Sequence, residues 1–291
     1  MEYSSFSYSE RDLCRIPPRP AESHKGTFGR VLCVAGSRGM CGAAYLAAKA
    51  AYRVGAGLVR ILTVKENLPI LQTLLPEAIV TTYDGEAPEA DVIAEAEAWA
   101  DVLVIGCGMG ISRASRSVLS TLLRLSRKPK VLDADALNLL GRNPSLLKYA
   151  RGAILTPHPL EASRLCGLGV AEILAEPEEI AYRMAKKYGV ICAIKTHHTA
   201  VSDGGSFLYR NASGNSGMAT GGSGDVLAGI IGGLLAQARS TDLSPFTVAC
   251  LGVYVHGLCG AGAAKRLSEY SGMASDLIDA LPQVLSWVER K

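Results

Sequence analysis

Nine residues late in the chain read Gly217-Met218-Ala219-Thr220-Gly221-Gly222-Ser223-Gly224-Asp225. The density of glycine lets backbone N–H groups close around an anion without hindrance from side chains. An apolar run follows over residues 226–231, and it predicts that a helix begins here with its N-terminus facing the anion. We therefore expect Gly221, Gly222 and Ser223 to form a cradle for a phosphate.

Asp225 is the ionisable group of this cradle. A carboxylate beside a bound phosphate is unfavourable unless it has a task, such as taking a proton from a hydroxyl that attacks phosphorus. The alternative is that Asp225 only caps the helix, as many aspartates do. The glycines around it favour the catalytic interpretation.

Strand-like and helix-like segments alternate through most of the chain. This alternation predicts a three-layer α/β/α sandwich, a mainly parallel sheet with helices on both faces. We expect residues 1–24 to be an extended lead-in, the fold to start near Gly29, and residues 25–291 to form a single domain. The expected strands are residues 30–35, 58–63, 102–106, 130–133, 153–156 and 190–195, then a hairpin of 200–203 and 206–210. The expected helices are residues 43–54, 68–74, 113–125, 136–140, 178–188, one that starts at 159, and the chain after 225.

Two further glycine-rich loops follow predicted strands. Gly106-x-Gly108-x-Gly110 lacks the spacing of a dinucleotide fingerprint, so a tight turn and a ligand contact remain equally open. Residues 37–43 have the glycines of a phosphate loop but not its lysine, which excludes a P-loop.

Three polar positions lie at other predicted strand ends, where ligands bind in parallel sheets. His158 stands between Pro157 and Pro159, which fix the direction of its imidazole, although a lone histidine is more often structural. Lys195 can reach a phosphate or remain an exposed strand-end lysine. His197 and His198 are adjacent, so we expect their rings to point apart and to bind no zinc.

Composition excludes several classes of protein. The formal net charge is +3 and the basic residues are scattered, which gives no nucleic-acid footprint. The eight cysteines form no CxxC pair, as is typical of reduced thiols in a cytoplasmic protein. The N-terminus lacks the pattern of a signal peptide, and residues 246–264 fit a buried core helix better than a membrane span. We expect a cytoplasmic protein that binds neither nucleic acid nor membrane.

Taken together, four loops closely resemble the ADP/ATP-dependent NAD(P)H-hydrate dehydratases, metabolite-repair enzymes of the ribokinase-like superfamily. The resemblance runs from about Lys25 to the C-terminus, and it implies a ribokinase-like fold. It also implies a hydro-lyase that restores the S epimer of hydrated NADH or NADPH, with the terminal phosphoryl group of ADP or ATP activating the departing hydroxyl. The loops are Ala35-Gly36-Ser37, Val131-Leu132-Asp133-Ala134-Asp135-Ala136-Leu137-Asn138, Leu155-Thr156-Pro157-His158-Pro159-x-Glu161 and the stretch from Gly214 to Leu227.

The resemblance also implies roles for individual residues. Ala43, Gly108, His158 and Asp225 match positions that contact the hydrated dinucleotide, and Asp225 matches the catalytic base. Many members read Lys-Gly-x-x-Thr in the nucleotide loop, whereas this sequence has threonine at the second position, which places the detailed backbone contacts in doubt. Magnesium is implied because phosphoryl transfer needs charge neutralisation, but no ligand set is visible. The matching nucleotide contacts are Lys195, Thr196, His197, His198, Thr199 and Gly224.

Other expectations concern partners and rival functions. We expect an epimerase to be a separate protein, ADP to be the donor, and a homo-oligomer such as a tetramer to form through apolar helices such as residues 226–238. A vitamin-precursor kinase of the same superfamily would keep Asp225 and the cradle but lack the His158 loop. A nucleotide-binding regulator without turnover is another alternative, and a Rossmann dehydrogenase is disfavoured by the glycine spacing.

Overall fold

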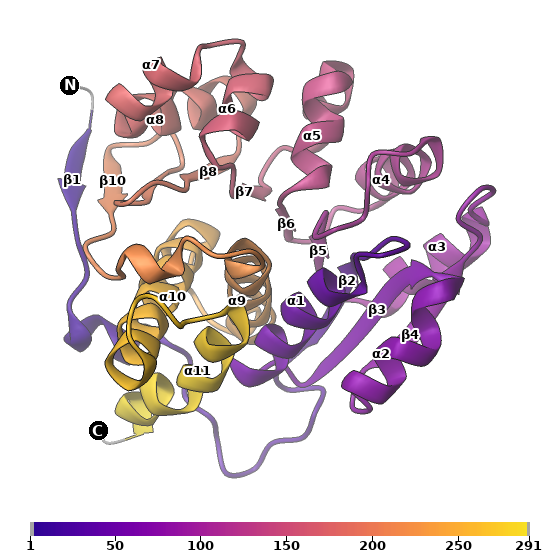
Figure 1. The fold of residues 1–291 in the computed structure, drawn as a ribbon, viewed down its shortest axis with the longest axis horizontal. Helices are drawn as coiled ribbons and strands as arrows, with labels where there is room; N and C mark the ends of the chain where they lie inside the picture. Colours follow the sequence, from indigo (N-terminus) through magenta and orange to yellow (C-terminus); the bar gives the residue numbers. More distant parts are fainter. Residues whose placement is uncertain (1–2, 290–291) are drawn as a thin grey trace.

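The computed structural model describes residues 3–289, which form one mainly parallel sheet between two layers of helices (Figure 1). The strand order is β1-β10-β9-β8-β7-β6-β5-β2-β3-β4, and only the β8–β9 and β9–β10 pairs are antiparallel. The strands are β1 (Ser4–Phe6), β2 (Arg30–Val34), β3 (Leu58–Val64), β4 (Ile79–Tyr83), β5 (Val102–Ile105), β6 (Lys130–Leu132), β7 (Ile154–Leu155), β8 (Ile191–Ile194), β9 (Ala200–Ser202) and β10 (Phe207–Arg210).

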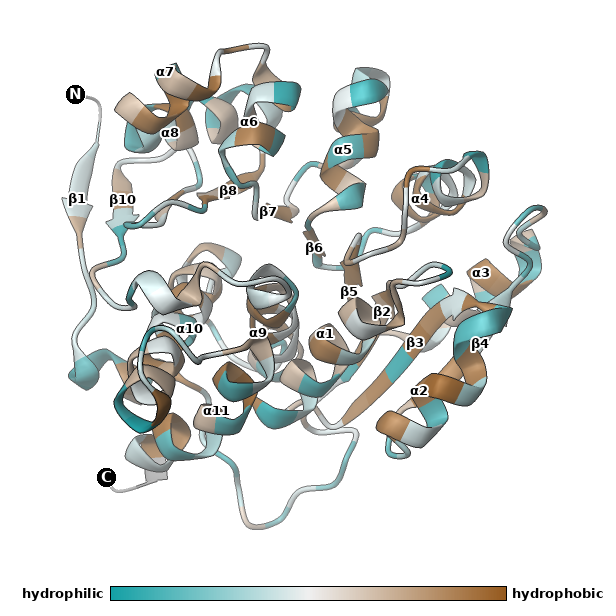
Figure 2. Cartoon of the chain, viewed as in Figure 1, coloured by the Kyte–Doolittle hydropathy of each residue, from teal (hydrophilic) through white to brown (hydrophobic). Residues whose placement is uncertain are grey.

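The central strands are buried on both faces. In β2, Val31 and Cys33 belong to one hydrophobic core, whereas Leu32 and Val34 belong to the other. This alternation follows from the pleat, which directs successive side chains to opposite faces. Figure 2 shows apolar residues along β2, β3 and β5, as expected for strands covered on both sides.

Each core has its own set of helices. The first core is covered by α1 (Cys41–Arg53), α2 (Leu68–Leu74), α9 (Ser223–Ala238), α10 (Pro245–Leu267) and α11 (Ala274–Glu289). The second is covered by α3 (Ala90–Trp99), α4 (Arg113–Leu125), α5 (Asp135–Arg142), α6 (Pro159–Cys166), α7 (Val170–Ala175) and α8 (Pro177–Tyr188). The fold is therefore the predicted three-layer α/β/α sandwich.

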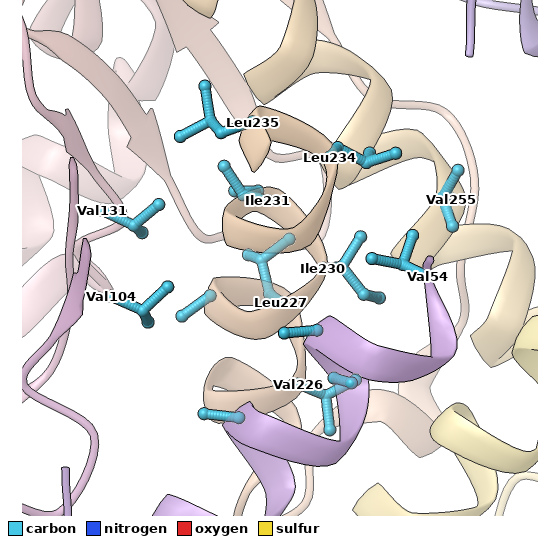
Figure 3. Packing of buried hydrophobic residues seen from close by; sticks show 14 of the residues in the cluster. Val54, Val104, Val131, Val226, Leu227, Ile230, Ile231, Leu234, Leu235 and Val255 are labelled. Atoms are coloured by element: carbon cyan, nitrogen blue, oxygen red, sulfur yellow. The ribbon is translucent and has the colours of Figure 1, made fainter. Parts of the chain in front are cut away.

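Helix α9 is the central element of the first core. It lies between the sheet residues Val104 and Val131 on one side and Val54 and Val255 on the other (Figure 3). Its glycines allow this close fit, because a Cβ on Gly229 would lie 2.2 Å from the carbonyl oxygen of Ala47 in α1. Every residue from 226 to 238 is buried, so the expectation that this helix supplies a subunit interface is wrong. Its apolar surface is used inside the subunit.

Helix α10 contains the membrane-like stretch. It is the one helix in the described chain that is long and apolar enough to cross a membrane, but 72% of its most apolar window is buried inside the structure. It packs against α9 and α11. The expectation of a core helix agrees with this burial.

The N-terminal segment differs from the extended lead-in that we expected. Strand β1 pairs in parallel with β10, and Glu10–Arg15 forms a 3-10 helix whose Leu13 is buried. Phe6 and Tyr8 pack on Tyr209, with ring centroids 5.5 and 4.8 Å away. The fold thus begins well before Gly29, because this aromatic cluster and backbone pairing hold a polar segment that carries no periodic pattern.

Candidate active site

A cavity of about 920 Å³ opens at the carboxyl ends of β6, β7 and β8, where the sequence predicts ligand binding. The N-terminus of α9, the start of α6 and the middle of α10 surround it. Its lining includes Asp133, Ala134, His158, Glu161, residues 195–199, residues 211–216, Met218, residues 222–225, Val253 and His256.

The predicted cradle lies at the start of α9. Gly222 is the N-cap residue and has a φ of 89°, a left-handed conformation that favours glycine. The first N–H groups of a helix have no partner within it, so those of α9 are available to an anion together with the positive end of the helix dipole. A Cβ on Gly224 would lie 3.2 Å from Lys195 Nζ, which places this ammonium beside the first turn.

Asp225 lies in this first turn and is largely buried. Burial is the main cause that raises the pKa of its carboxyl to about 7, and the nearby charge of Asp133 raises it further. Atoms of Cys107, Asp133 and Asp225 lie within 4.8 Å of one another. A carboxyl that titrates near neutrality in a cleft can both take and return a proton.

Lys195 is placed between two buried carboxylates. Its Nζ lies 2.6 Å from Asp133 Oδ1 and 3.9 Å from Glu161 Oε2. Burial alone would lower the pKa of Lys195, but the two carboxylates outweigh it and raise the pKa above its ordinary value. The ammonium therefore remains charged beside the start of α9.

His158 caps α6 with its side chain. Its Nδ1 accepts hydrogen bonds from the backbone N–H groups of Leu160 and Glu161, at 3.2 and 3.4 Å. Its Nε2 lies 3.1 Å from Glu161 Oε1. A neutral imidazole with its proton on Nε2 satisfies all these contacts, so the backbone and Glu161 together set the tautomer.

His256 joins α10 to the start of α9. Its Nε2 lies 3.0 Å from the backbone oxygen of Ser223 and 3.3 Å from the Ser223 hydroxyl. Burial lowers the pKa of His256 to about 4. The imidazole is therefore neutral near pH 7, and it donates to the Ser223 carbonyl when the proton is on Nε2.

The loop of residues 195–199 accommodates threonine at its second position. Thr196 is not among the described residues with positive φ, and its hydroxyl donates to the His198 carbonyl at 2.9 Å. The rings of His197 and His198 lie 4.4 Å apart, so our expectation that they point apart is wrong. Side-chain alternation holds in a strand, whereas these residues lie in a bend.

The group formed by Cys107, Asp133 and Asp225 does not fit magnesium. Mg²⁺ requires oxygen ligands in octahedral geometry. Burial is the main cause that raises the pKa of the Cys107 thiol well above its ordinary value, so it stays protonated, and Asp133 is engaged with Lys195. No protein cage for magnesium is assigned to these residues.

Comparisons with known proteins place this chain in a family. The family profile described as NAD(P)H-hydrate dehydratase matches residues 31–283. The chain belongs to this NAD(P)H-hydrate dehydratase family. Its fold is that of the ribokinase-like proteins, and an Enterococcus faecalis protein of that superfamily superposes with a TM-score of 0.86 at 32% identity, over 97% of this chain and 95% of that one.

Several members of the NAD(P)H-hydrate dehydratase family are similar over most of this chain. The ADP-dependent (S)-NAD(P)H-hydrate dehydratase of Neisseria meningitidis is 41% identical, over 89% of this chain and 84% of its own length. The ADP/ATP-dependent NAD(P)H-hydrate dehydratase of Bacillus subtilis, co-crystallised with ATP and Mg²⁺, superposes with a TM-score of 0.82 at 30% identity, covering 96% of each chain.

Other relatives in the family are longer. The bifunctional NAD(P)H-hydrate repair enzyme Nnr of Escherichia coli is 40% identical over 93% of this chain, which corresponds to 50% of the Nnr protein. The chain thus spans about half the length of such bifunctional relatives.

The structure brings most, but not all, of the predicted site residues to one cavity. His158, residues 195–199, Gly222, Ser223, Gly224 and Asp225 line it. Gly221, Ala43 and Gly108 lie outside this lining. Ala43, in the first turn of α1, and Gly108, in the loop after β5, lie together, since a Cβ on Gly108 would be 2.7 Å from the Ala43 Cβ.

Sequence reasoning did not assign site roles to four residues: Cys107, Asp133, Glu161 and His256. Cys107 and Asp133 lie in loops that the sequence analysis describes, and Glu161 lies in the first turn of α6, next to His158. His256 gave only the weak signal of a histidine within an apolar helix.

Proposed function

We propose that this chain is an ADP- or ATP-dependent hydro-lyase that converts the S epimer of NAD(P)H hydrate back to NAD(P)H. It releases phosphate and AMP when ADP is the donor, or phosphate and ADP when ATP is. The observation that carries this proposal is the juxtaposition at the start of α9 of an anion cradle, the Lys195 ammonium and the partly buried Asp225.

The proposed chemistry uses phosphorylation to make a leaving group. Asp225 takes the proton of the hydrate's ring hydroxyl as that oxygen attacks the terminal phosphorus of the nucleotide. The nucleotide departs with one phosphate fewer. In the resulting ester, the C–O bond breaks and phosphate leaves with its electron pair, while the ring nitrogen supplies electrons. Loss of a ring proton then forms the double bond of NAD(P)H.

We assign the site residues to two ligands. Ala43, Gly108, His158 and Asp225 contact the hydrated dinucleotide. The nucleotide lies along residues 195–199 and Gly224, with its phosphates over Gly221, Gly222 and Ser223. The lining of the cavity supports the nucleotide assignment, and the shared position of Ala43 and Gly108 supports a substrate surface beside it.

The donor is proposed to be ADP, which agrees with the name of the Neisseria relative. We propose that Mg²⁺ enters with the nucleotide, held by its phosphates. The Bacillus subtilis relative was co-crystallised with both ATP and Mg²⁺, which supports this combination. Removal of Mg²⁺ with a chelator should then lower the rate without unfolding the protein.

Recovery of NADH from its hydrate tests the proposal. The protein is incubated with hydrated NADH and either ADP or ATP, and absorbance is followed at the NADH maximum. Asp225→Asn should lose at least about 10³-fold in rate while it still binds nucleotide, because its amide cannot accept the proton. Asp203→Asn, on an exposed hairpin turn, is the matched control and should keep the wild-type rate.

Two outcomes would reject this function. Tight nucleotide binding with no recovery of NADH by either nucleotide would point to a kinase for another small molecule. Unchanged activity in Asp225→Asn would point to a regulator without turnover.

The wider context of the protein is also proposed. All eight cysteines are free, which supports a reducing compartment such as the cytoplasm. We infer that a homo-oligomer such as a tetramer forms and that an epimerase activity supplies the S epimer. Sedimentation equilibrium tests the oligomer, and turnover of the R hydrate only after an epimerase is added tests the pairing.

A further inference from the structure

Asp133 is a buried carboxylate for which the proposed chemistry has no role. It is 1% exposed and follows β6 directly. One of its oxygens binds Lys195 Nζ at 2.6 Å, and the other would be 3.5 Å from a Cβ on Gly224. Asp133 and the ammonium therefore lie side by side at the first turn of α9, which carries Asp225.

The turn that contains Asp133 is strained and closely packed. The next residue, Ala134, has a φ of 47° and a ψ of −117°, a strained conformation for a residue with a side chain. The Asp133 carbonyl also approaches Gly106 so closely that a Cβ there would lie 1.9 Å from it. Such strain persists only where the surroundings fix the backbone, so Asp133 is held in one position.

We propose that Asp133 is a positioning residue that holds the Lys195 ammonium at the start of α9 and prevents it from pairing with Asp225. The proposal rests on the proposed function, in which Asp225 is a base. Without Asp133, the Lys195 ammonium would have Asp225 as an alternative partner, since the two carboxylates share one cluster within 4.8 Å.

The separation matters for proton transfer. A carboxylate paired with an ammonium is a weaker base than one without a cation, because the pair favours the charged form. Asp133 binds the cation and also adds a negative charge near Asp225. Both effects maintain the affinity of Asp225 for a proton, while Lys195 stays beside the cradle where phosphate charge is expected.

Other groups also face Asp225 and must be included in the test. The Cys107 thiol donates a hydrogen bond from the loop after β5, and Asp135 acts from the start of α5. Glu161 shares Lys195 from α6, and His256 is neutral on α10. Asp135 is the most useful control, because it is an acid on the same turn that binds the Gly110 N–H at 2.8 Å rather than Lys195.

The test is a titration of Asp225 in nucleotide-free protein labelled with ¹³C at aspartate carboxyl groups, assigned with Asp225→Asn. In Asp133→Asn, the pKa of Asp225 should fall by about one unit or more, a tenfold or larger loss of proton affinity. In Lys195→Met the pKa of Asp225 should rise, because the positive charge that lowers it is removed and the charge of Asp133 is no longer neutralised. In Asp135→Asn the pKa of Asp225 should fall by less than in Asp133→Asn. The pKa that describes the acid limb of the pH–rate profile should shift in the same direction as the Asp225 pKa in each variant.

The charges of Asp133 and Lys195 by themselves raise and lower the pKa of Asp225, so the decisive comparison is Asp133→Asn with and without Lys195. If Asp133 holds the ammonium away from Asp225, Asp133→Asn should lower the pKa of Asp225 by more in the presence of Lys195 than in the Lys195→Met background. Equal shifts in the two backgrounds, or an unchanged pKa in folded Asp133→Asn, would overturn the proposal. If Asp133→Asn does not fold, Asp133→Ala takes its place in the same comparison. Wild-type protein that never regenerates NADH would reject the proposed function, whereas the NMR titration judges the positioning role independently.

Discussion

Asp225 is a candidate catalytic residue whose ionised carboxyl lowers the stability of the folded protein. Its carboxyl is buried beside Asp133, so its pKa is raised to about 7. A group whose pKa is raised on folding stabilises the protein below its unfolded pKa, and this contribution is lost as the pH rises through the folded value. The stabilising contribution of Asp225 is therefore lost between about pH 4 and about pH 7.

Replacement of Asp225 by asparagine should stabilise the ligand-free protein under alkaline conditions. At about pH 8 we expect Asp225→Asn to exceed the wild type by roughly 1–3 kcal/mol in free energy of unfolding, because the buried charge is gone. Near pH 4 the two proteins should be equal. Urea unfolding at both pH values measures this, and exposed Asp203→Asn should show no such pH-dependent difference.

At the scale of elements, the geometry of the site depends on how α9 packs against α1 and α10. Its N-terminus supplies the cradle, and its glycines let α1 approach closely enough to fix its position. His256 adds a hydrogen bond from α10 to the first turn. The contacts of α9 with α1 and α10 therefore determine where Asp225 lies.

Gly229→Ala should disturb the close packing of α9 against α1. Its Cβ would lie 2.2 Å from the Ala47 carbonyl oxygen, so the helices must separate, at a cost of about 1–3 kcal/mol of stability. Gly42→Ala in the first turn of α1 meets nothing within 4 Å and should be neutral or stabilising by about 0.5 kcal/mol. Thermal unfolding of both variants tests the contrast. Equal effects would mean that helix propensity, and not close packing, governs Gly229.

His256 should make the contact between α9 and α10 sensitive to acid. Its pKa is lowered to about 4, so its contribution to stability is present above about pH 6.5 and is lost as the pH falls through about 4. His256→Gln can still donate to Ser223 but does not titrate. The difference in unfolding free energy between wild type and variant should thus shift by about 1–3 kcal/mol in favour of the variant between pH 6.5 and 4. A pH-independent difference would contradict this account.

At the scale of the whole molecule, the N-terminal segment completes one edge of the sheet. Phe6 packs on Tyr8, Tyr209 and Phe246. Strand β1 also pairs with β10, which would otherwise be an edge strand. We infer that residues 3–16 belong to the same cooperative unit as the rest of the fold.

Phe6→Ala should therefore destabilise the entire protein by about 1–3 kcal/mol without changing nucleotide affinity. Phe207→Ala is the matched control, since Phe207 lies on the neighbouring strand but is 60% exposed. Its effect should stay within about 0.5 kcal/mol. Urea midpoints measured by fluorescence and by circular dichroism should coincide for both variants. Separate transitions would show that the N-terminal segment unfolds alone.

Sequence patterns predicted the long elements well. Helices α2 and α4 have the predicted bounds, because both are regular helical patterns. Strand β4 and helix α3 were not predicted, although Ile79-Val80-Thr81-Thr82-Tyr83 carries the β-branched and aromatic residues of a strand. Strand β1 was also missed, and its place depends on aromatic contacts with Tyr209 and Phe246, which lie some two hundred residues later.

The sequence by itself determined the α/β alternation, the glycine-rich start of α9 and the resemblance of four loops to one family, because these depend on local residue types and spacing. Only the tertiary structure decided which polar groups face one another. Asp133 and Lys195 are 62 positions apart, yet their charged atoms lie 2.6 Å apart. The parallel strands β6 and β8 end at the same edge of the sheet, so the order of strands, which no local pattern specifies, brought Asp133 and Lys195 together beside the start of α9.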